Sequence, residues 1–154
     1  TVVRLLSMGV ESFNLASSLT AIVAQRLLRC LCSKCKVLDT TATPDLLVHC
    51  GVHPKYAPKI QVFAAPGCEH CHYTGTKGRI AVMEVMVMND PIRDAILKGM
   101  SAKDLKRVAM QSGMRTLRQA ALNKMVQGVT GIIEITKNTA PDIWDVAGST
   151  TTAA

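Results

Sequence analysis

Aromatic side chains are scarce in this chain of 154 residues, where they account for 3% of the sequence. Proteins that hold single-stranded nucleic acid stack the bases on aromatic rings that stand beside cationic side chains. The composition therefore argues against a nucleic-acid partner, although the net charge of +7 favours anionic partners in general. The aromatic set is scattered rather than interleaved with a basic stretch: Phe13, Tyr56, Phe63, Tyr73 and Trp144.

The sequence also lacks a long apolar run and a nucleotide-binding loop. The longest apolar candidate, at 80–88, is interrupted by Glu84 and falls short of the roughly 20 residues that span a bilayer. No Gly-Lys dipeptide occurs, so there is no Walker A loop to cradle phosphates. No apolar strand ends in an acidic pair that would hold Mg²⁺. We therefore expect the isolated chain not to hydrolyse ATP.

Cysteine, by contrast, occurs in a specific pattern. The pairs Cys32-Ser-Lys-Cys35 and Cys68-Glu-His-Cys71 each place two residues between their sulfurs. This spacing lets one short turn aim both thiolates at a single ion, and two such turns supply the four soft ligands that tetrahedral zinc prefers. We predict that Cys32, Cys35, Cys68 and Cys71 bind one structural zinc ion, with residues 36–67 forming an insert between the two turns.

Other uses of paired cysteines remain open. Disulfides are typical of secreted chains, and a redox dithiol needs one pair, whereas two pairs favour a metal. His70 and His72 flank Cys71 and are alternative ligands, while Cys30 is expected to pack within a strand. A zinc-ribbon nucleic-acid-binding module and a thiol oxidoreductase are the rival functional interpretations.

Hydrophobic periodicity predicts an α/β chain whose second half is helical. Asp90 and Pro91 suit the cap and first position of a helix, and glycines at 99, 113 and 128 suit helix ends. The start resembles the end of a helix without its cap, which is expected of a fragment of a longer protein. We expect helices at 11–19, 90–98, 102–112, 116–127 and 130–137, strands at 20–31, 60–64 and 79–88, and a disordered tail at 140–154.

The order and spacing of these motifs closely resemble the C-terminal part of the ATPases that drive type II secretion and type IV pilus assembly. The resemblance covers about residues 1–139. Ala81 departs from it where a glycine is usual, and Gln119 and Ala120 stand where acidic residues are common. The motifs are Met8-Gly-Val-Glu-Ser-Phe-Asn-Leu-Ala-Ser-Ser-Leu19, Ala24-Gln-Arg-Leu-Leu-Arg29, Gly67-Cys-Glu-His-Cys71, Thr74-Gly75, Lys77-Gly-Arg79, Glu84, Gly113-Met-Arg-Thr-Leu-Arg118 and Gly128-Val-Thr130.

This resemblance implies a domain plan and a role. Residues 1–31 and 79–88 would be the C-terminal piece of a RecA-like ATPase core, residues 32–78 a tetracysteine zinc insert, and residues 89–139 a helical subdomain forming a small bundle. In the family the catalytic elements lie upstream, so ATP and Mg²⁺ would bind only the full-length parent. Six copies would form a cytoplasmic ring, peripheral at the inner membrane, that works on a platform protein.

Five arginines are candidate contact residues. Arg26 and Arg29 lie three positions apart in a strand, on opposite faces, and Arg79 opens another strand. All three are candidates for contact with a nucleotide or a neighbouring subunit. Arg115 and Arg118 lie within one helical turn of each other and are candidates for a partner-docking face. Solvated surface arginines are the alternative for all five.

Overall fold

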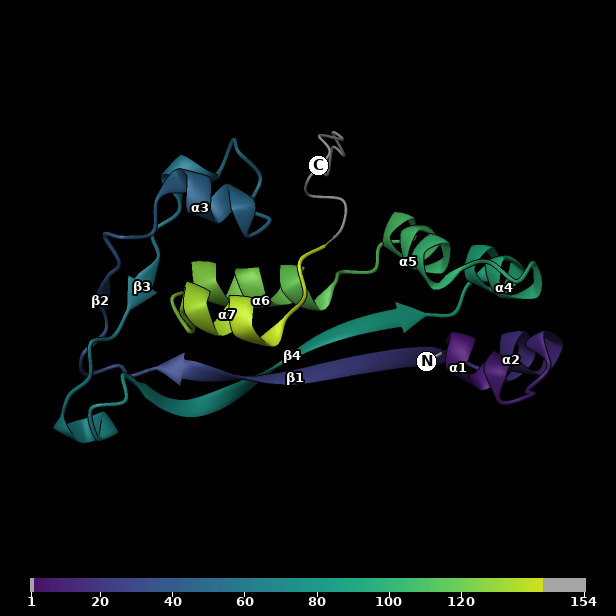
Figure 1. Cartoon of the computed structure of the whole chain (residues 1–154), viewed down its shortest axis with the longest axis horizontal. Coiled ribbons are helices and arrows are strands. Elements are labelled where there is room, and N and C mark those ends of the chain that lie inside the picture. Colours follow the sequence, from purple (N-terminus) through teal and green to yellow (C-terminus); the bar gives the residue numbers. More distant parts are fainter. Residues whose placement is uncertain (1, 143–154) are drawn as a thin grey trace. The chain divides into compact units, whose positions relative to one another are not determined.

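A computed structural model of the chain describes residues 2–142 (Figure 1). The predicted disordered tail therefore lies, from residue 143 onwards, outside the described residues. The predicted helices and the two long strands are present with small shifts at their ends, whereas the predicted strand at 60–64 is reduced to two residues. The elements are α1 (Val2–Ser7), α2 (Ser12–Ser18), β1 (Ala21–Leu31), β2 (Val37–Leu38), α3 (Pro44–His49), the 3₁₀ turn η1 (Ala57–Lys59), β3 (Phe63–Ala64), the 3₁₀ turn η2 (Glu69–Cys71), β4 (Thr76–Val87), α4 (Asp90–Leu97), α5 (Ala102–Gln111), α6 (Leu117–Val126) and α7 (Ile132–Asn138).

Two small sheets carry the cysteine turns. The long strands β1 and β4 pair as one two-stranded sheet, and the short strands β2 and β3 pair as another. The second pair is antiparallel, with Val37 opposite Ala64 and Leu38 opposite Phe63. β1 ends at Leu31, directly before Cys32, and β4 begins soon after the second cysteine turn. The sheets therefore bring the two turns to one place although they are far apart in sequence.

The described chain divides into two compact units. The first consists of residues 2–24 and 83–116. Its core is built from α2, α4 and α5, with Leu15, Ile92 and Ala109 among its buried residues. α4 begins where the Asn89 side chain accepts a hydrogen bond from the N–H of Ile92, as an N-cap residue does. The Asn89 cap and the apolar stripe of α4 fix how this helix packs in its unit.

The second unit consists of residues 25–82 and 117–142 and contains the cysteine turns. Its core combines the sheet residue Leu28 with Leu47 of α3, Met125 of α6 and Ile135 of α7, and each of these side chains is almost fully buried. α3 is capped by Thr43, whose hydroxyl accepts a hydrogen bond from a main-chain N–H at 3.3 Å. The insert between the cysteine pairs is therefore anchored in the same core as the last two helices.

The helices of the predicted subdomain 89–139 fall into two pairs, one in each unit. α4 and α5 bury their apolar residues with α2, whereas α6 and α7 bury theirs with β1, β4 and the insert. The sequence predicts one small bundle because helical periodicity shows which face is apolar but not which element covers it. None of the helices within residues 2–142 is long and apolar enough to cross a membrane.

Candidate metal centre

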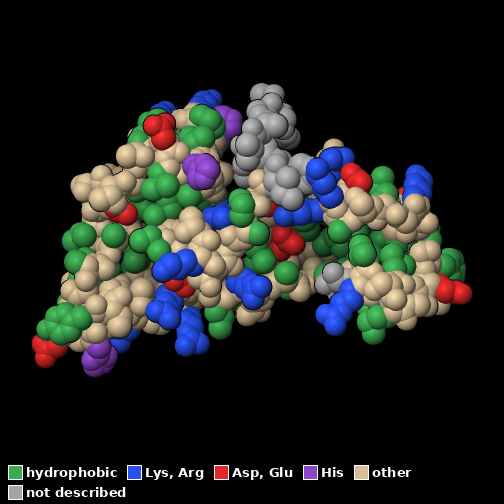
Figure 2. Space-filling view, in the orientation of Figure 1, with side chains coloured by type: hydrophobic (Ala, Val, Ile, Leu, Met, Phe, Trp, Pro, Cys, Tyr) green, Lys and Arg blue, Asp and Glu red, His purple; other side chains and the backbone are tan. Residues whose placement is uncertain are grey.

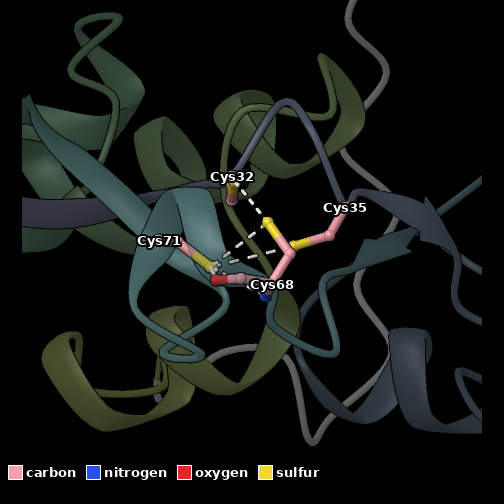
Figure 3. A group of neighbouring side chains, drawn as sticks. All are labelled: Cys32, Cys35, Cys68 and Cys71. Atoms are coloured by element: carbon pink, nitrogen blue, oxygen red, sulfur yellow. Dashed lines mark hydrogen bonds between the residues drawn. The ribbon is translucent and has the colours of Figure 1, made fainter.

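The sulfur atoms of the four paired cysteines converge on one point (Figure 3). Their Sγ atoms all lie within 4.8 Å of one another. The Sγ–Sγ distances are 3.9 Å from Cys32 to Cys68, 3.9 Å from Cys35 to Cys71, and 3.8 Å from Cys68 to Cys71. A tetrahedral zinc ion with Zn–S bonds of about 2.3 Å requires sulfur atoms about 3.8 Å apart. The donor set and its spacing therefore fit zinc, as the sequence predicts.

The second cysteine turn depends on backbone that folds back over Cys68. The carbonyl of Cys68 accepts hydrogen bonds from the N–H groups of Cys71, at 3.1 Å, and of Tyr73, at 2.8 Å. His72 and Tyr73 both adopt left-handed backbone, with φ of 50° and 60°. Gly67 approaches the same loop so closely that a Cβ there would lie 2.6 Å from the Tyr73 carbonyl oxygen. Uncommon backbone is thus concentrated where the chain must wrap around a ligand sulfur.

Main-chain and hydroxyl hydrogen bonds connect the two cysteine turns and stabilise the second one. The N–H of Cys32 donates to the carbonyl of Gly75 at 2.9 Å, which joins the first turn to the end of the second. The Thr74 hydroxyl donates to the carbonyl of Cys71 at 2.6 Å. These bonds support the backbone that carries the ligand sulfurs.

The thiols differ in how readily they ionise. Burial raises the pKa of the Cys71 thiol, but main-chain N–H donors at Cys68 and Gly75 together with neighbouring thiols outweigh it and lower the pKa to about 6. Burial and the adjacent sulfur atoms raise the pKa of Cys35 to about 12, against the donor at Gly67. Without a cation the site therefore favours a mixture of thiolate and thiol. Zinc binding would drive ionisation of Cys35 and release its proton.

Four thiolate ligands leave zinc without an open coordination position. Catalytic zinc sites keep one position for water or substrate, whereas sites with four cysteines are structural. The arrangement can therefore hold the turns together, and the four-cysteine set provides no place for a reacting group.

Comparison with known proteins places this architecture in a family. The family model described as Type II/IV secretion system protein matches residues 1–137. The chain belongs to this family. The match confirms the family resemblance that the motifs indicate.

Curated relatives of the chain act in both kinds of machine. It is 40% identical over 142 residues to the type IV pilus assembly ATPase PilB of Myxococcus xanthus, covering 92% of this chain and 25% of that protein. It is 39% identical over 138 residues to PilB of Thermus thermophilus, covering 90% and 15%. It is 31% identical over 141 residues to the type II secretion system protein E of Aeromonas hydrophila, covering 92% and 27%. The chain thus spans about a quarter or less of the length of each.

The alternative ligands lie outside the cluster in this secretion-family chain. His70 is exposed, and its Nε2 atom lies 3.2 Å from the ammonium nitrogen of Lys77, while His72 is also exposed. Cys30 is partly buried and takes no part in the group of four. Cys50 is buried in the core of the second unit, and this burial raises the pKa of its thiol. Neither of these two cysteines supplies a ligand sulfur to the metal site.

Lys36 fastens the first cysteine turn to the last two helices, a role that the sequence analysis missed. Its ammonium donates to the carbonyl of Gly128 at 3.1 Å and lies 4.9 Å from the centre of the Phe63 ring. Gly128 ends α6 with φ of 68°, and a Cβ there would lie 3.1 Å from that ring. The position of Lys36 directly after a ligand cysteine was the available sequence signal, but its partner is 92 residues away.

We expect Lys36→Met to destabilise the zinc-bound chain by roughly 1 kcal/mol, because a charge-assisted hydrogen bond and a cation–π contact are lost at a partly exposed site. Urea denaturation monitored by circular dichroism measures the change. Lys34→Met is the matched control, since Lys34 lies in the same turn and is exposed. Equal losses in the two variants would show that the contacts of Lys36 are not stabilising.

Three of the candidate contact arginines are exposed on the second unit. Arg26 and Arg29 lie on β1 and Arg79 on β4. Within residues 2–142 no hydrogen bond or ion pair engages any of their guanidinium groups. The main chain of Arg29 is used, since its N–H donates to Glu134 at 3.0 Å and its carbonyl accepts from Thr130 at 2.9 Å. The side chains of these three arginines are therefore available for a partner.

Arg115 and Arg118 do not form the shared docking face that the sequence suggests. Arg115 is exposed and belongs to the first unit, whereas Arg118 is 5% exposed and belongs to the second. The guanidinium of Arg118 donates to the carbonyls of Thr139 at 2.8 Å and Ala140 at 3.4 Å. Arg118 thus holds the chain that leaves α7, and Arg115 alone remains a docking candidate.

Proposed function

We propose that this chain is the non-catalytic C-terminal part of a hexameric ATPase motor that powers type IV pilus assembly or type II secretion. The observation that carries the proposal is the convergence of four cysteine sulfurs within a chain that a secretion-family model matches over residues 1–137. Zinc at this site is structural. It makes the two turns and their insert a rigid surface of the motor.

ATP and Mg²⁺ bind elsewhere in the parent protein, which supplies the Walker elements that this sequence lacks. The strands β1 and β4 continue a RecA-like sheet of that protein. The outer face of β4 supports this role, because Met83, Val85 and Val87 follow the two-residue period of a strand and are 48%, 40% and 62% exposed. An apolar strand face of this kind is expected to be covered by further structure.

Cationic side chains make the motor's contacts with nucleotide, neighbouring subunits and the platform protein. Arg26, Arg29 and Arg79 face a nucleotide or a neighbouring subunit, and Arg115 faces the inner-membrane platform protein. The parent acts in the cytoplasm at the inner membrane, and its function involves no nucleic acid. The guanidinium groups of Arg26, Arg29 and Arg79 have no hydrogen-bond or ion-pair partner within residues 2–142, which supports this assignment. An isolated cation on a surface adds little to the stability of its own chain.

We expect no metal-dependent ATP hydrolysis by the chain alone, whereas the intact parent protein hydrolyses ATP. Phosphate release with Mg²⁺, measured on both proteins after the same purification, tests this difference. The intact protein assayed without Mg²⁺ is the control for contaminating phosphatases. Turnover by the isolated chain that survives further purification would contradict the proposed division of labour.

The cellular role is tested by deleting the gene for the parent protein and scoring surface pili and secreted proteins. Loss of one of the two identifies the machine. A strain that keeps both would overturn the proposed function.

A further inference from the structure

The groove between α2 and α4 has apolar walls that the chain leaves exposed. Phe13 on α2 is 69% exposed and Leu97 on α4 is 47% exposed. With Ala16 and Ser17 they line a hollow of about 280 Å³ in the first unit. Large apolar side chains gathered at one hollow are typical of a surface that another protein covers.

The same groove presents negative charge on a chain whose net charge is +7. Asp90 and Asp94 lie one turn apart on α4 and both line the hollow. Neither carboxylate has a hydrogen-bond or ion-pair partner within residues 2–142. Arg93, between them, also lines the hollow and donates hydrogen bonds to the carbonyls of Ala16 and Leu19, so the two carboxylates outnumber the one guanidinium there. Like charges one turn apart disfavour a helix, so a cation brought by a partner would find a favourable position beside this pair.

An exposed surface of the opposite character lies on α7, in the second unit. Ile133 is 65% exposed and Lys137 is exposed, while Ile132 and Ile135 on the same helix are buried in the core. Residues four apart share one face of a helix, so an isoleucine and a lysine stand together there. The Lys137 ammonium has no partner within the described part of the chain. Lys and Arg side chains gather over α7 and the neighbouring ends of β1 and β4 (Figure 2).

We propose that α7 of a second copy docks into the α2–α4 groove of the first, with Ile133 against Phe13 and Leu97 and with Lys137 at the two carboxylates. The inference rests on the proposed function, in which copies of the parent assemble, and it names the surfaces that meet. The two surfaces differ, so the contact is heterologous. Repeated contacts of this kind close into a ring when the rotation between copies permits.

A second copy suits the groove because the chain itself carries both halves of the match. The α2–α4 groove combines apolar walls with two carboxylates that have no partner within residues 2–142. The surface of α7 combines an apolar side chain with an ammonium that also has no partner there. Apolar contact would supply the burial, and the opposite charges would fix partner and register. Each charge also gains a partner that residues 2–142 of its own chain do not provide.

Charge exchange in the intact parent protein tests the contact. Asp94→Lys and Lys137→Asp are each expected to lower the association constant by roughly tenfold or more, measured by sedimentation velocity, because each places like charges opposite one another. The double variant restores an opposite pair at every interface and is expected to recover most of the association. Recovery by the double variant is specific to these two residues facing each other.

Two matched variants separate this contact from the effect of net charge. Asp45→Lys and Lys59→Asp make the same charge changes at exposed residues of the insert, and we expect them to leave association unchanged. Equal losses in these controls would overturn the contact, as would a double variant no better than the single ones. A parent ring that is indifferent to both single variants would overturn the contact alone. A parent that never associates would overturn the proposed function as well.

Discussion

Replacing Cys68 by serine is expected to remove zinc from the chain and to lower its affinity for the metal by more than about 100-fold. The serine hydroxyl stays protonated near neutral pH and is a poor substitute for a thiolate in a tetrahedral site of soft ligands. Structural zinc binding contributes about 10–16 kcal/mol to the folding of small zinc domains, so losing the ion affects folding as well as composition. Elemental analysis of zinc per chain, on protein purified without added metal, measures the first effect.

The unfolding caused by zinc loss should be confined to the cysteine turns. Leu47 of α3 is 1% exposed within the core shared with α6 and α7, and none of the four ligand cysteines belongs to that core. We therefore expect amide exchange to accelerate at the N–H groups of Cys32 and Tyr73, which bond within the turns, and to stay slow in α3. In the intact parent, disordered turns are expected to impair assembly.

Cys30→Ser is the matched control for the ligand variant. Cys30 lies two residues from Cys32 and is partly buried, but its sulfur is outside the group of four. We expect this variant to keep one zinc ion per chain. A full zinc content in Cys68→Ser, or an equal loss in Cys30→Ser, would refute the four-cysteine assignment.

The metal centre was predictable because the spacing of the cysteines within each pair is a local signal in the sequence. Cys32 and Cys35 share one turn, as do Cys68 and Cys71, and that spacing indicates a common ion without knowledge of the fold. That the two turns meet is a long-range fact, but the chemistry of tetrahedral zinc requires four ligands and so predicts it. The sulfur positions confirm this expectation.

The long-range contacts around the metal centre and among the helices were not predictable from the sequence. In the sequence Lys36 resembles any surface lysine, because only the fold places Gly128 and Phe63 beside it. Arg118 lies on a helix that looks solvent-facing in sequence, yet the chain after α7 returns to cover it. Periodicity also cannot tell that α4 packs with α2 while α6 packs with the insert. Each of these facts depends on residues far apart in the chain, whereas periodicity reports local faces.

Gly75→Ala is expected to destabilise the zinc-bound chain by about 3 kcal/mol or more. Gly75 is buried with φ of 70°, and a Cβ there would overlap the carbonyl oxygen of Ala65. The left-handed backbone costs a residue with a Cβ roughly 1–2 kcal/mol, and relieving the overlap by moving main chain costs roughly 1–3 kcal/mol more. Because the carbonyl of Gly75 holds the N–H of Cys32, the movement also displaces a zinc ligand.

Gly78→Ala separates these two costs. Gly78 has φ of 83°, similar to that of Gly75, but a Cβ there would meet no atom within 4 Å. This variant is therefore expected to lose only the backbone cost of roughly 1–2 kcal/mol and to bind zinc normally. Urea denaturation of both variants, together with zinc titration in competition with a chelating dye, measures the two effects. Similar stability losses and unchanged zinc affinity in both variants would mean that the approach of Gly75 to Ala65 does not set the geometry of the metal centre.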